Sequence, residues 1–252
     1  MNIVVCVKQV PDPNLEPQLD GTRLKRDVAS VLDPGDEFGV EAGLQFAEAH
    51  GGGVTVVSMG PPQAMEAIRK ALSMGAAKGI LVSDDALQNS DALATARVLA
   101  KAIERNGFDL VIAGVESTDG YSGVVPGMVA ELLGVPQGTF AKHLELADGS
   151  LKLHRQTERG YDEVEVALPA VVTVTAGANE PRYPSFKGIV GAKSKPVEQL
   201  SLSDLGLGDE AQETQNVSNV SDAEQRSAGE IVEDDGTAAA KIADYLQRAK
   251  VI

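Results

Sequence analysis

Short apolar runs alternate with amphipathic segments through the first half of the chain, and this alternation restricts the fold more than any other feature. Short, continuous apolar runs are typical of strands that are buried on both faces of a parallel sheet. The segments between them space their apolar residues with the period of a helix. We therefore expect strands at 3–7, 54–59, 79–82 and 110–113, and helices at 33–49, 62–74, 92–105 and 125–133. Repeated β–α units of this kind predict an α/β fold with a doubly wound, mostly parallel sheet.

The segment Asp33-Pro34-Gly35-Asp36-Glu37 has the composition of a helix start. Asp33 can cap the helix, Pro34 suits its first position, and the acidic residues that follow complement the positive end of the helix dipole. A polar stretch from Lys8 to Arg26 separates the first expected strand from this start.

The pattern changes near residue 140. Further segments have the alternating or β-branched composition of strands, at 140–146, 150–156, 162–166 and 170–175. Asp148-Gly149 between the first two is a strong hairpin signal. The last of the four is suited to a return to the main sheet. We interpret 140–168 as a β-hairpin insertion in an α/β nucleotide-binding domain that spans residues 1–200.

The remaining residues have a different character. Residues 201–235 are polar, with little of the periodicity that forms a core, whereas 237–249 are again helical in pattern. A structureless connection of about thirty residues is uncommon inside a compact domain. We therefore expect 201–252 to be an extended arm with a C-terminal helix that finds its contacts on another chain.

The net charge of −15 and the single cysteine exclude several classes of function. Nucleic acid and anionic membrane surfaces both favour clustered Lys and Arg, so neither is an expected partner. Cys6 alone forms no internal disulfide and no multi-cysteine metal site, and the three histidines show no metal-ligand spacing. No apolar run reaches the roughly 20 residues of a membrane span, and residues 1–10 lack the features of a signal peptide. We expect a soluble, cytoplasmic protein.

The loop from Gly114 to Val125 joins the end of an expected strand to the start of a helix. Open α/β sheets bind ligands at that edge, and free N–H groups at a helix N-terminus can hold a phosphate. The candidate donors are the backbone N–H groups of Ser122, Gly123, Val124 and Val125. Gly120 and Gly123 let the backbone approach a ligand closely. An ordinary strand-to-helix turn is the other interpretation, because short motifs have low specificity.

No constellation of catalytic residues occurs, so the chain is not expected to be an enzyme by itself. Cys6 lies within an expected strand, where a cysteine is more typical of a small core hydrophobe than of a nucleophile. Lys187, Lys193 and Lys195 form a small basic cluster in an acidic protein. This cluster is either a solvated face or a docking patch.

A stretch near residue 180 resembles a family signature. Residues 171–189 read VVTVTAGANEPRYPSFKGI and strongly resemble the signature of the electron transfer flavoprotein β subunit, an Asn-Glu-Pro-Arg-Tyr core followed by a helix with lysines. Further matches follow in the family's order along essentially the whole chain, at Val7-Lys8-Gln9-Val10-Pro11, Val57-Ser58-Met59-Gly60-Pro61, Ala71-Leu72-Ser73-Met74-Gly75-Ala76, Pro136-Gln137-Gly138-Thr139-Phe140 and Gln225-Arg226-Ser227-Ala228-Gly229.

This resemblance implies a heterodimer whose larger α subunit binds most of the FAD, while the β subunit buries AMP. Electrons would pass from primary dehydrogenases, such as the acyl-CoA dehydrogenases of fatty acid β-oxidation, to a quinone reductase. The family's AMP positions, with the adenine beside the cysteine, correspond to Cys6, Asp33, Pro34, Gly35, Asp36, Met59, Gly114, Asp119, Gly120, Tyr121, Ser122, Gly123, Val124 and Val125. The last three replace polar side chains known in some relatives, so their contacts with phosphate would be made by backbone N–H groups.

The resemblance also implies that residues 180–195 form a recognition loop that docks the dehydrogenase through an apolar anchor at Phe186. The docking residues would be Glu180, Arg182, Tyr183, Phe186, Lys187, Ile189 and Lys193. Burial of Phe186 in the core is the alternative interpretation.

Two further places in the sequence bear on the flavin. Pro13 and Leu15 fall near the region that approaches the flavin ring from the β side. Gln156 stands where many relatives have a carboxylate, and Arg159 where they have glycine. These two departures imply a difference in how the mobile flavin domain is positioned.

Two other functions remain open at this point. One is an electron-bifurcating subunit that binds a second FAD in place of AMP, because a subset of the family does so. The other is a stand-alone AMP-binding regulatory protein built on a similar sheet. The nucleotide and flavin that copurify with the chain distinguish these possibilities.

Overall fold

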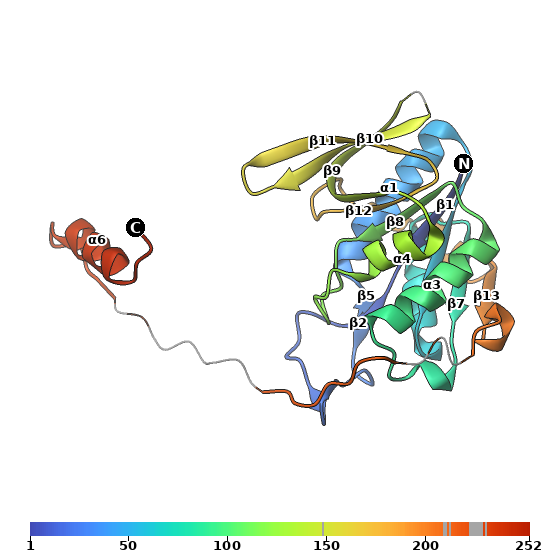
Figure 1. Ribbon diagram of the computed structural model, residues 1–252, viewed down its shortest axis with the longest axis horizontal. Coiled ribbons are helices and arrows are strands. Elements are labelled where there is room, and N and C mark those ends of the chain that lie inside the picture. Colours follow the sequence, from blue (N-terminus) through green and yellow to red (C-terminus); the bar gives the residue numbers. More distant parts are fainter. Residues whose placement is uncertain (148, 209–210, 212, 222–228, 230) are drawn as a thin grey trace. The chain divides into compact units, whose positions relative to one another are not determined.

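The computed structural model describes the chain of 252 residues except for residues 148, 209–210, 212, 222–228 and 230. The chain divides into two compact units, Met1–Ser218 and Asn219–Ile252. Figure 1 labels the helices and strands of both units.

A nine-stranded sheet forms the centre of the first unit, in the order β11-β10-β9-β12-β8-β1-β6-β7-β13 (Figure 1). The strands are β1 (Asn2–Cys6), β6 (Gly53–Met59), β7 (Lys78–Val82), β8 (Leu110–Gly114), β9 (Gln137–Ala147), β10 (Ser150–Thr157), β11 (Gly160–Ala167), β12 (Ala170–Val174) and β13 (Val197–Leu200). From β9 to β13 in the sheet order all neighbouring strands are parallel, whereas β10 and β11 are antiparallel additions at one edge. The prediction of a doubly wound, mostly parallel α/β fold is therefore confirmed.

Helices cover both faces of this sheet. On one face lie α1 (Pro34–His50), α2 (Met65–Met74) and α5 (Phe186–Ala192), and on the other lie α3 (Ala92–Asn106) and α4 (Val125–Leu133). The side chains of Ile3 and Val5 pack in the core beneath α1 and α2, and that of Val4 packs in the core beneath α3. Because successive residues of β1 face two different cores, the strand is apolar throughout, and this is the signal that the sequence displays.

The first helix begins as its sequence predicts. The Asp33 carboxylate accepts a hydrogen bond from the backbone N–H of Gly35 at 2.8 Å, and Pro34 occupies the first helical position. Such a cap stabilises a helix by about 1 kcal/mol. The helix expected from Pro62 instead begins with a 3-10 turn, η1 (Pro62–Ala64), before α2. Two other 3-10 turns are η2 (Asp85–Leu87) and η3 (Ser203–Leu205).

The hairpin insertion is also present. Strands β9 and β10 pair from Ser150 opposite Ala147, and β10 pairs with β11. The expected turn residue Asp148 lies outside the described residues. Strand β12 returns to the main sheet between β8 and β9, as its composition predicts. Strand β9 starts at Gln137, earlier than expected, because its first residues pair in parallel with β12.

The polar stretch after β1 folds into two small sheets. In this β1–α1 connection, residues 7–33, β2 (Gln9–Pro11) pairs with β5 (Ser30–Leu32), and β3 (Leu19–Asp20) pairs with β4 (Arg23–Leu24). The residues from 13 to 23 are all exposed. The connection therefore projects from the sheet edge on a short antiparallel base.

The compact unit continues beyond residue 200, where the arm was expected to begin. Leu205, Leu207 and Ala211 are buried in the core beneath α3. Asp91 caps α3 and also accepts hydrogen bonds from the backbone N–H groups of Thr214 and Gln215 at 2.6 and 2.9 Å. The first unit consequently ends at Ser218.

The second unit contains α6 (Ala238–Arg248), close to the helix predicted for residues 237–249. Its side chains Ile242 and Tyr245 are exposed. Of the family motif at 225–229, residues 225–228 lie outside the described residues. In the part of the chain that the structure describes, no helix is long and apolar enough to span a membrane.

Candidate functional site

The sheet has a topological switch point beside β1. The chain passes from β1 through β6 to β7 in one direction, and β8 then pairs on the other side of β1. Connections that leave β1 and β8 therefore diverge at the carboxyl ends of these strands. Open α/β sheets bind ligands in a crevice at such a point, and we call this region the crevice. Cys6 and Gly114 end the two strands, and Met59 ends the neighbouring β6.

Two aspartates join the start of α1 to the walls of this crevice. The fully buried Asp33 carboxylate accepts hydrogen bonds from the backbone N–H and the hydroxyl of Thr118, at 2.7 and 3.0 Å. The Asp36 carboxylate accepts one from the backbone N–H of Lys8 at 2.7 Å. The helix start, the end of β1 and the loop after β8 thus form one hydrogen-bonded assembly. The resemblance placed Asp33 and Asp36 in the candidate site, and their contacts with Thr118 and Lys8 are found only in the structure.

The crevice leaves no room for a side chain at Gly114. A Cβ at this position would lie 2.8 Å from Oδ1 of Asp36 and 3.3 Å from the backbone carbon of Gly35. A Cβ on Gly35 would itself lie 3.1 Å from Oδ1 of Asp33. Glycine at these two positions therefore allows the start of α1 to pack closely against the end of β8 and the loop that follows it.

The pKa values of two groups at the base of the crevice, Asp36 and Cys6, are raised. Burial, together with the negative charge of Asp33, raises the pKa of Asp36 well above its usual value. Burial and the nearby Asp36 also raise the pKa of the Cys6 thiol to about 12. A thiolate is the nucleophilic form of cysteine, so Cys6 is suited to packing rather than to attack. This agrees with the interpretation of Cys6 as a small apolar residue.

Asp119 is the centre of an ionic cluster that sequence reasoning did not find. Its carboxylate lies 2.7 Å from Nζ of Lys8 and 2.6 Å from a guanidinium nitrogen of Arg26, and the Asp119 side chain is 2% exposed. Burial would raise the pKa of Asp119, but Lys8, Ser117 and Arg26 outweigh it and lower this pKa to about 2. We call Lys8, Arg26 and Asp119 the Asp119 cluster.

The second half of the loop is open to solvent. Tyr121, Ser122, Gly123 and Val124 are exposed, and Tyr121 and Gly123 have positive φ angles of 47° and 63°. No side chain in the described part of the chain caps the N-terminus of α4. The first backbone N–H groups of this helix are consequently free of side-chain acceptors and suited to hold an anion.

A second candidate surface lies on the helix layer that contains α1 and α2. The stretch that we predict to be a recognition loop, residues 180–195, contains Arg182, which binds two glutamates of α1. Its Nε lies 2.8 Å from Glu41 and a terminal nitrogen lies 2.5 Å from Glu48. Hydrogen bonds from Arg182 outweigh the effect of burial and lower the pKa of Glu41. The Arg182 side chain, assigned to docking by the resemblance, thus lies against α1.

Helix α5 is held closely against α2. Arg69 of α2 donates hydrogen bonds to the backbone carbonyls of Ala192 and Lys195 at 2.6 and 2.8 Å. The Lys195 ammonium donates to the carbonyls of Leu72 and Ala76 at the end of α2, so this lysine serves as a helix cap. A Cβ on Gly188 would lie 2.4 Å from the carbonyl oxygen of Ser73. Only glycine permits this separation of the two helices.

The outer side of α5 presents large apolar side chains. Tyr183 is 94% exposed, Phe186 83% and Ile189 52%. Phe186 is therefore not part of the core. We call the set Tyr183, Phe186, Lys187, Ile189 and Lys193 the docking surface.

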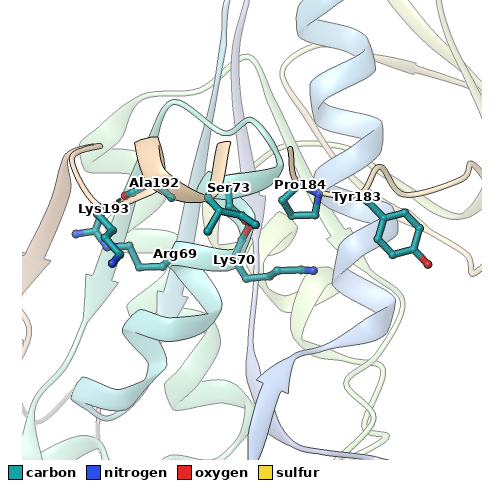
Figure 2. A pocket seen from close by; sticks show the side chains of 8 residues that line it. Arg69, Lys70, Ser73, Tyr183, Pro184, Ala192 and Lys193 are labelled. Carbon is teal, nitrogen blue, oxygen red and sulfur yellow. Dashed lines mark hydrogen bonds between the residues drawn. The ribbon is translucent and has the colours of Figure 1, made fainter. Parts of the chain in front are cut away.

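A groove of about 770 Å³ runs beside the docking surface. Its lining includes Arg69, Lys70, Ser73, Tyr183, Pro184, Ile189, Ala192 and Lys193. Figure 2 shows Arg69 and Lys193 at one end of the groove and Tyr183 at the other. The groove therefore has cationic side chains at one end and an aromatic ring at the other.

The remaining predicted positions are the two flavin-side residues and the two departures from the family pattern. Pro13 and Leu15 are exposed in the β1–α1 connection. Gln156 lies near the end of β10 and Arg159 in the turn that follows, and both are exposed. Among the described residues, no group of three or more His, Cys, Asp or Glu side chains is arranged to hold a metal ion.

Comparison with known proteins assigns the family. The fold and crevice define a doubly wound α/β protein with its candidate site at the switch point of the sheet. The electron transfer flavoprotein domain family matches residues 22–205. Electron transfer flavoprotein subunit beta of Mycobacterium tuberculosis is 43% identical over 264 aligned residues, which cover 100% of this chain and 99% of that protein. The chain belongs to the electron transfer flavoprotein β-subunit family.

Two more distant relatives extend the comparison. The subunit beta of Clostridium acetobutylicum is 40% identical over 82% of this chain and 81% of its own length. The caffeyl-CoA reductase–Etf complex subunit CarD of Acetobacterium woodii is 39% identical over 84% of this chain and 82% of its own length. Membership of this family implies electron transfer flavoprotein function.

Proposed function

We propose that the chain is the β subunit of a heterodimeric electron carrier, in which an α subunit holds most of the FAD. The observation that carries this proposal is the alignment with a subunit beta over the full length of both chains. FAD supplies the redox chemistry when it is bound, and this chain supplies binding and docking surfaces. The chain alone is then not an enzyme, and electrons reach the heterodimer from primary dehydrogenases and leave it to a quinone reductase.

The crevice at the switch point is our proposed site for AMP. Glycine at 35 and 114 brings the start of α1 close to the end of β8, and Cys6 and Met59 offer sulfur-containing apolar surface for a base. The free N–H groups at the start of α4 suit a phosphate. Asp33 and Asp36 position the crevice walls through hydrogen bonds to backbone N–H groups. Recognition would therefore depend mainly on the main chain.

Analysis of the bound nucleotide tests this proposal. The chain is purified with its α partner, and acid-released nucleotides are quantified. One AMP and one FAD per heterodimer is the expected result. Two FAD molecules and no AMP would identify an electron-bifurcating subunit instead. A stable single chain with AMP and no flavin-bearing partner would favour a stand-alone regulatory protein.

The docking surface is our proposed contact for the dehydrogenase. Phe186 projects from a helix that is fixed on α2, with Lys187 and Lys193 nearby in sequence. A large exposed apolar group on a rigid base is typical of a hot spot, and the lysines favour a partner with an acidic rim.

Substitution of Phe186 tests this assignment. Phe186→Ala is expected to slow electron transfer at limiting dehydrogenase about tenfold or more, with AMP and FAD content unchanged. Leu132→Ala is the matched control, because Leu132 is an exposed apolar residue of α4 on the other helix layer. Equal rates of electron transfer for the two variants would show that Phe186 is not the anchor.

The unit Asn219–Ile252 is our proposed arm for the α subunit. Its helix α6 exposes Ile242 and Tyr245 along an otherwise polar segment. We expect amide hydrogen exchange in α6 to slow strongly when the α subunit is added. Strong protection of α6 in the isolated chain would contradict this role.

A further inference from the structure

The Asp119 cluster joins two segments that are distant in sequence. Its acid belongs to the loop Gly114–Val125, and its cations, Lys8 and Arg26, belong to the β1–α1 connection. The Asp119 side chain is 2% exposed, whereas those of Lys8 and Arg26 are 39% and 45% exposed. The cations thus cover an acid that would otherwise be buried without a counter-charge, which is strongly unfavourable.

The base of the β1–α1 connection packs in the core through Val10 and Leu32, whereas its outer part, residues 12–27, is joined to the rest of the unit by this cluster. In the described part of the chain, hydrogen bonds of segment 12–27 stay within the connection, as between Asp12 and Ala29 or Lys25 and Gln18, with the exception of Arg26. Arg26 therefore provides the polar link between the outer connection and the rest of the unit. Lys8 provides a second link at its base and also reaches Ser117 at 3.2 Å.

We propose that Lys8, Arg26 and Asp119 are positioning residues that fix the loop Gly114–Val125 and tie the β1–α1 connection to it. Asp119 immediately precedes the exposed segment 120–124. An acid held from two sides restricts the loop just before the backbone N–H groups at α4. The same contacts set the position of Pro13 and Leu15, so the nucleotide site and the proposed flavin-side segment are mechanically connected. The ligand in this inference rests on the function proposed above.

Charge alone would give a different outcome from positioning. The cluster contains two cations and one anion, so it carries a net positive charge beside the proposed phosphate site. If only this charge mattered, Asp119→Asn would strengthen binding of AMP, because both cations would then be uncompensated. If positioning matters, Asp119→Asn weakens binding although the local charge becomes more positive. The sign of this change separates the two explanations.

Hydrogen exchange and nucleotide binding on the full chain, with its α partner where the two copurify, test the proposal. Arg26→Gln and Asp119→Asn are compared with Lys25→Gln, whose partner Asp27 is exposed and lies 3.8 Å away. Both test variants are expected to exchange about tenfold faster than the control in segments 12–29 and 117–125, measured without nucleotide. Both are expected to bind AMP about tenfold more weakly.

Unchanged exchange in both segments, or tighter AMP binding by Asp119→Asn, would overturn the proposal. A parent protein that binds no AMP would contradict the proposed function instead, and the nucleotide-free exchange would still decide the role of the cluster. The Arg26 side chain lies at the surface, so Arg26→Gln still tests the proposal if Asp119→Asn folds poorly.

Discussion

The crevice and the docking surface use opposite strategies on the same scaffold. In the crevice, buried side chains such as Asp33 hold the backbone in place, and no side chain among the described residues caps the first backbone N–H groups of α4. On the docking surface, buried contacts hold α5 in place, and the side chains of Tyr183 and Phe186 are left accessible. A site that binds through backbone groups tolerates changes in the surrounding side chains. A site that binds through side chains depends on which side chains are present. Substitutions should therefore act differently in the two regions.

The same substitution should have opposite effects in the two regions, and this is the largest effect we expect. Gly114→Ala brings a Cβ within 2.8 Å of Asp36, which should lower the free energy of unfolding by about 1–3 kcal/mol and release the nucleotide. Gly191→Ala in α5 meets open space and should raise it by up to about 1 kcal/mol. Urea denaturation measures both values. Equal effects would show that the crevice relaxes around a new side chain.

The next effect concerns the support beneath the docking surface. Arg182→Gln removes the partner of Glu41, whose side chain is 4% exposed, and should lower the free energy of unfolding by about 1–2 kcal/mol. Solvent screens this ion pair because the guanidinium is partly exposed, which keeps the loss small. Amide exchange should accelerate in the recognition loop, with AMP content unchanged. Arg105→Gln is a control, because its ion pair with Glu198 is exposed on both sides. Loss of AMP in the Arg182 variant would show that the docking surface and the crevice are not independent.

The central strands β1, β6, β7, β8 and β12 follow from the sequence because each displays its double burial as an apolar run. The edge strand β13 is buried only at Leu200 and lacks this signal. The inner residues of β1, β6 and β8 are all buried, without an exposed position between them. The Asp119 cluster could not be found, because Lys8 and Arg26 lie far from Asp119 in sequence and nothing in their spacing indicates the contact. Which carboxylates an arginine meets is likewise a property of tertiary packing.

The end of the compact unit shows the same limit. Leu205 and Leu207 are buried, yet polar residues surround them in the sequence and hide the signal of a core segment. Arg182 is a second example. The family motif contains this arginine but does not reveal that the guanidinium lies against α1.

Acid should weaken the contacts of Asp119. The pKa of Asp119 is about 2 when folded and about 4 when unfolded, so its ionised form stabilises the protein above pH 4. This contribution is lost as the pH falls from about 4 to about 2, and after allowance for solvent screening it amounts to about 1 kcal/mol. Asp119→Asn should flatten the stability profile in that window. Asp91, with a pKa of about 2, acts in the same window, so Asp91→Asn serves as the comparison.

The smallest effect on stability should come from Phe186. An exposed side chain contributes little to the folded state, so Phe186→Ala should change the free energy of unfolding by less than about 0.5 kcal/mol. Thermal or urea denaturation measures this directly. A loss of more than 2 kcal/mol would show that Phe186 supports α5, and the side-chain strategy assigned to this surface would be wrong.

The bonds from Asp91 to Thr214 and Gln215 have a consequence for assembly. They fix the chain on the first unit shortly before it continues to the second. A partner that binds one unit therefore meets the other as an intramolecular event, at an effective concentration in about the millimolar range for a short connection. If α6 binds the α subunit as we propose, weak individual contacts suffice for a long-lived complex, because the two units bind the same partner together.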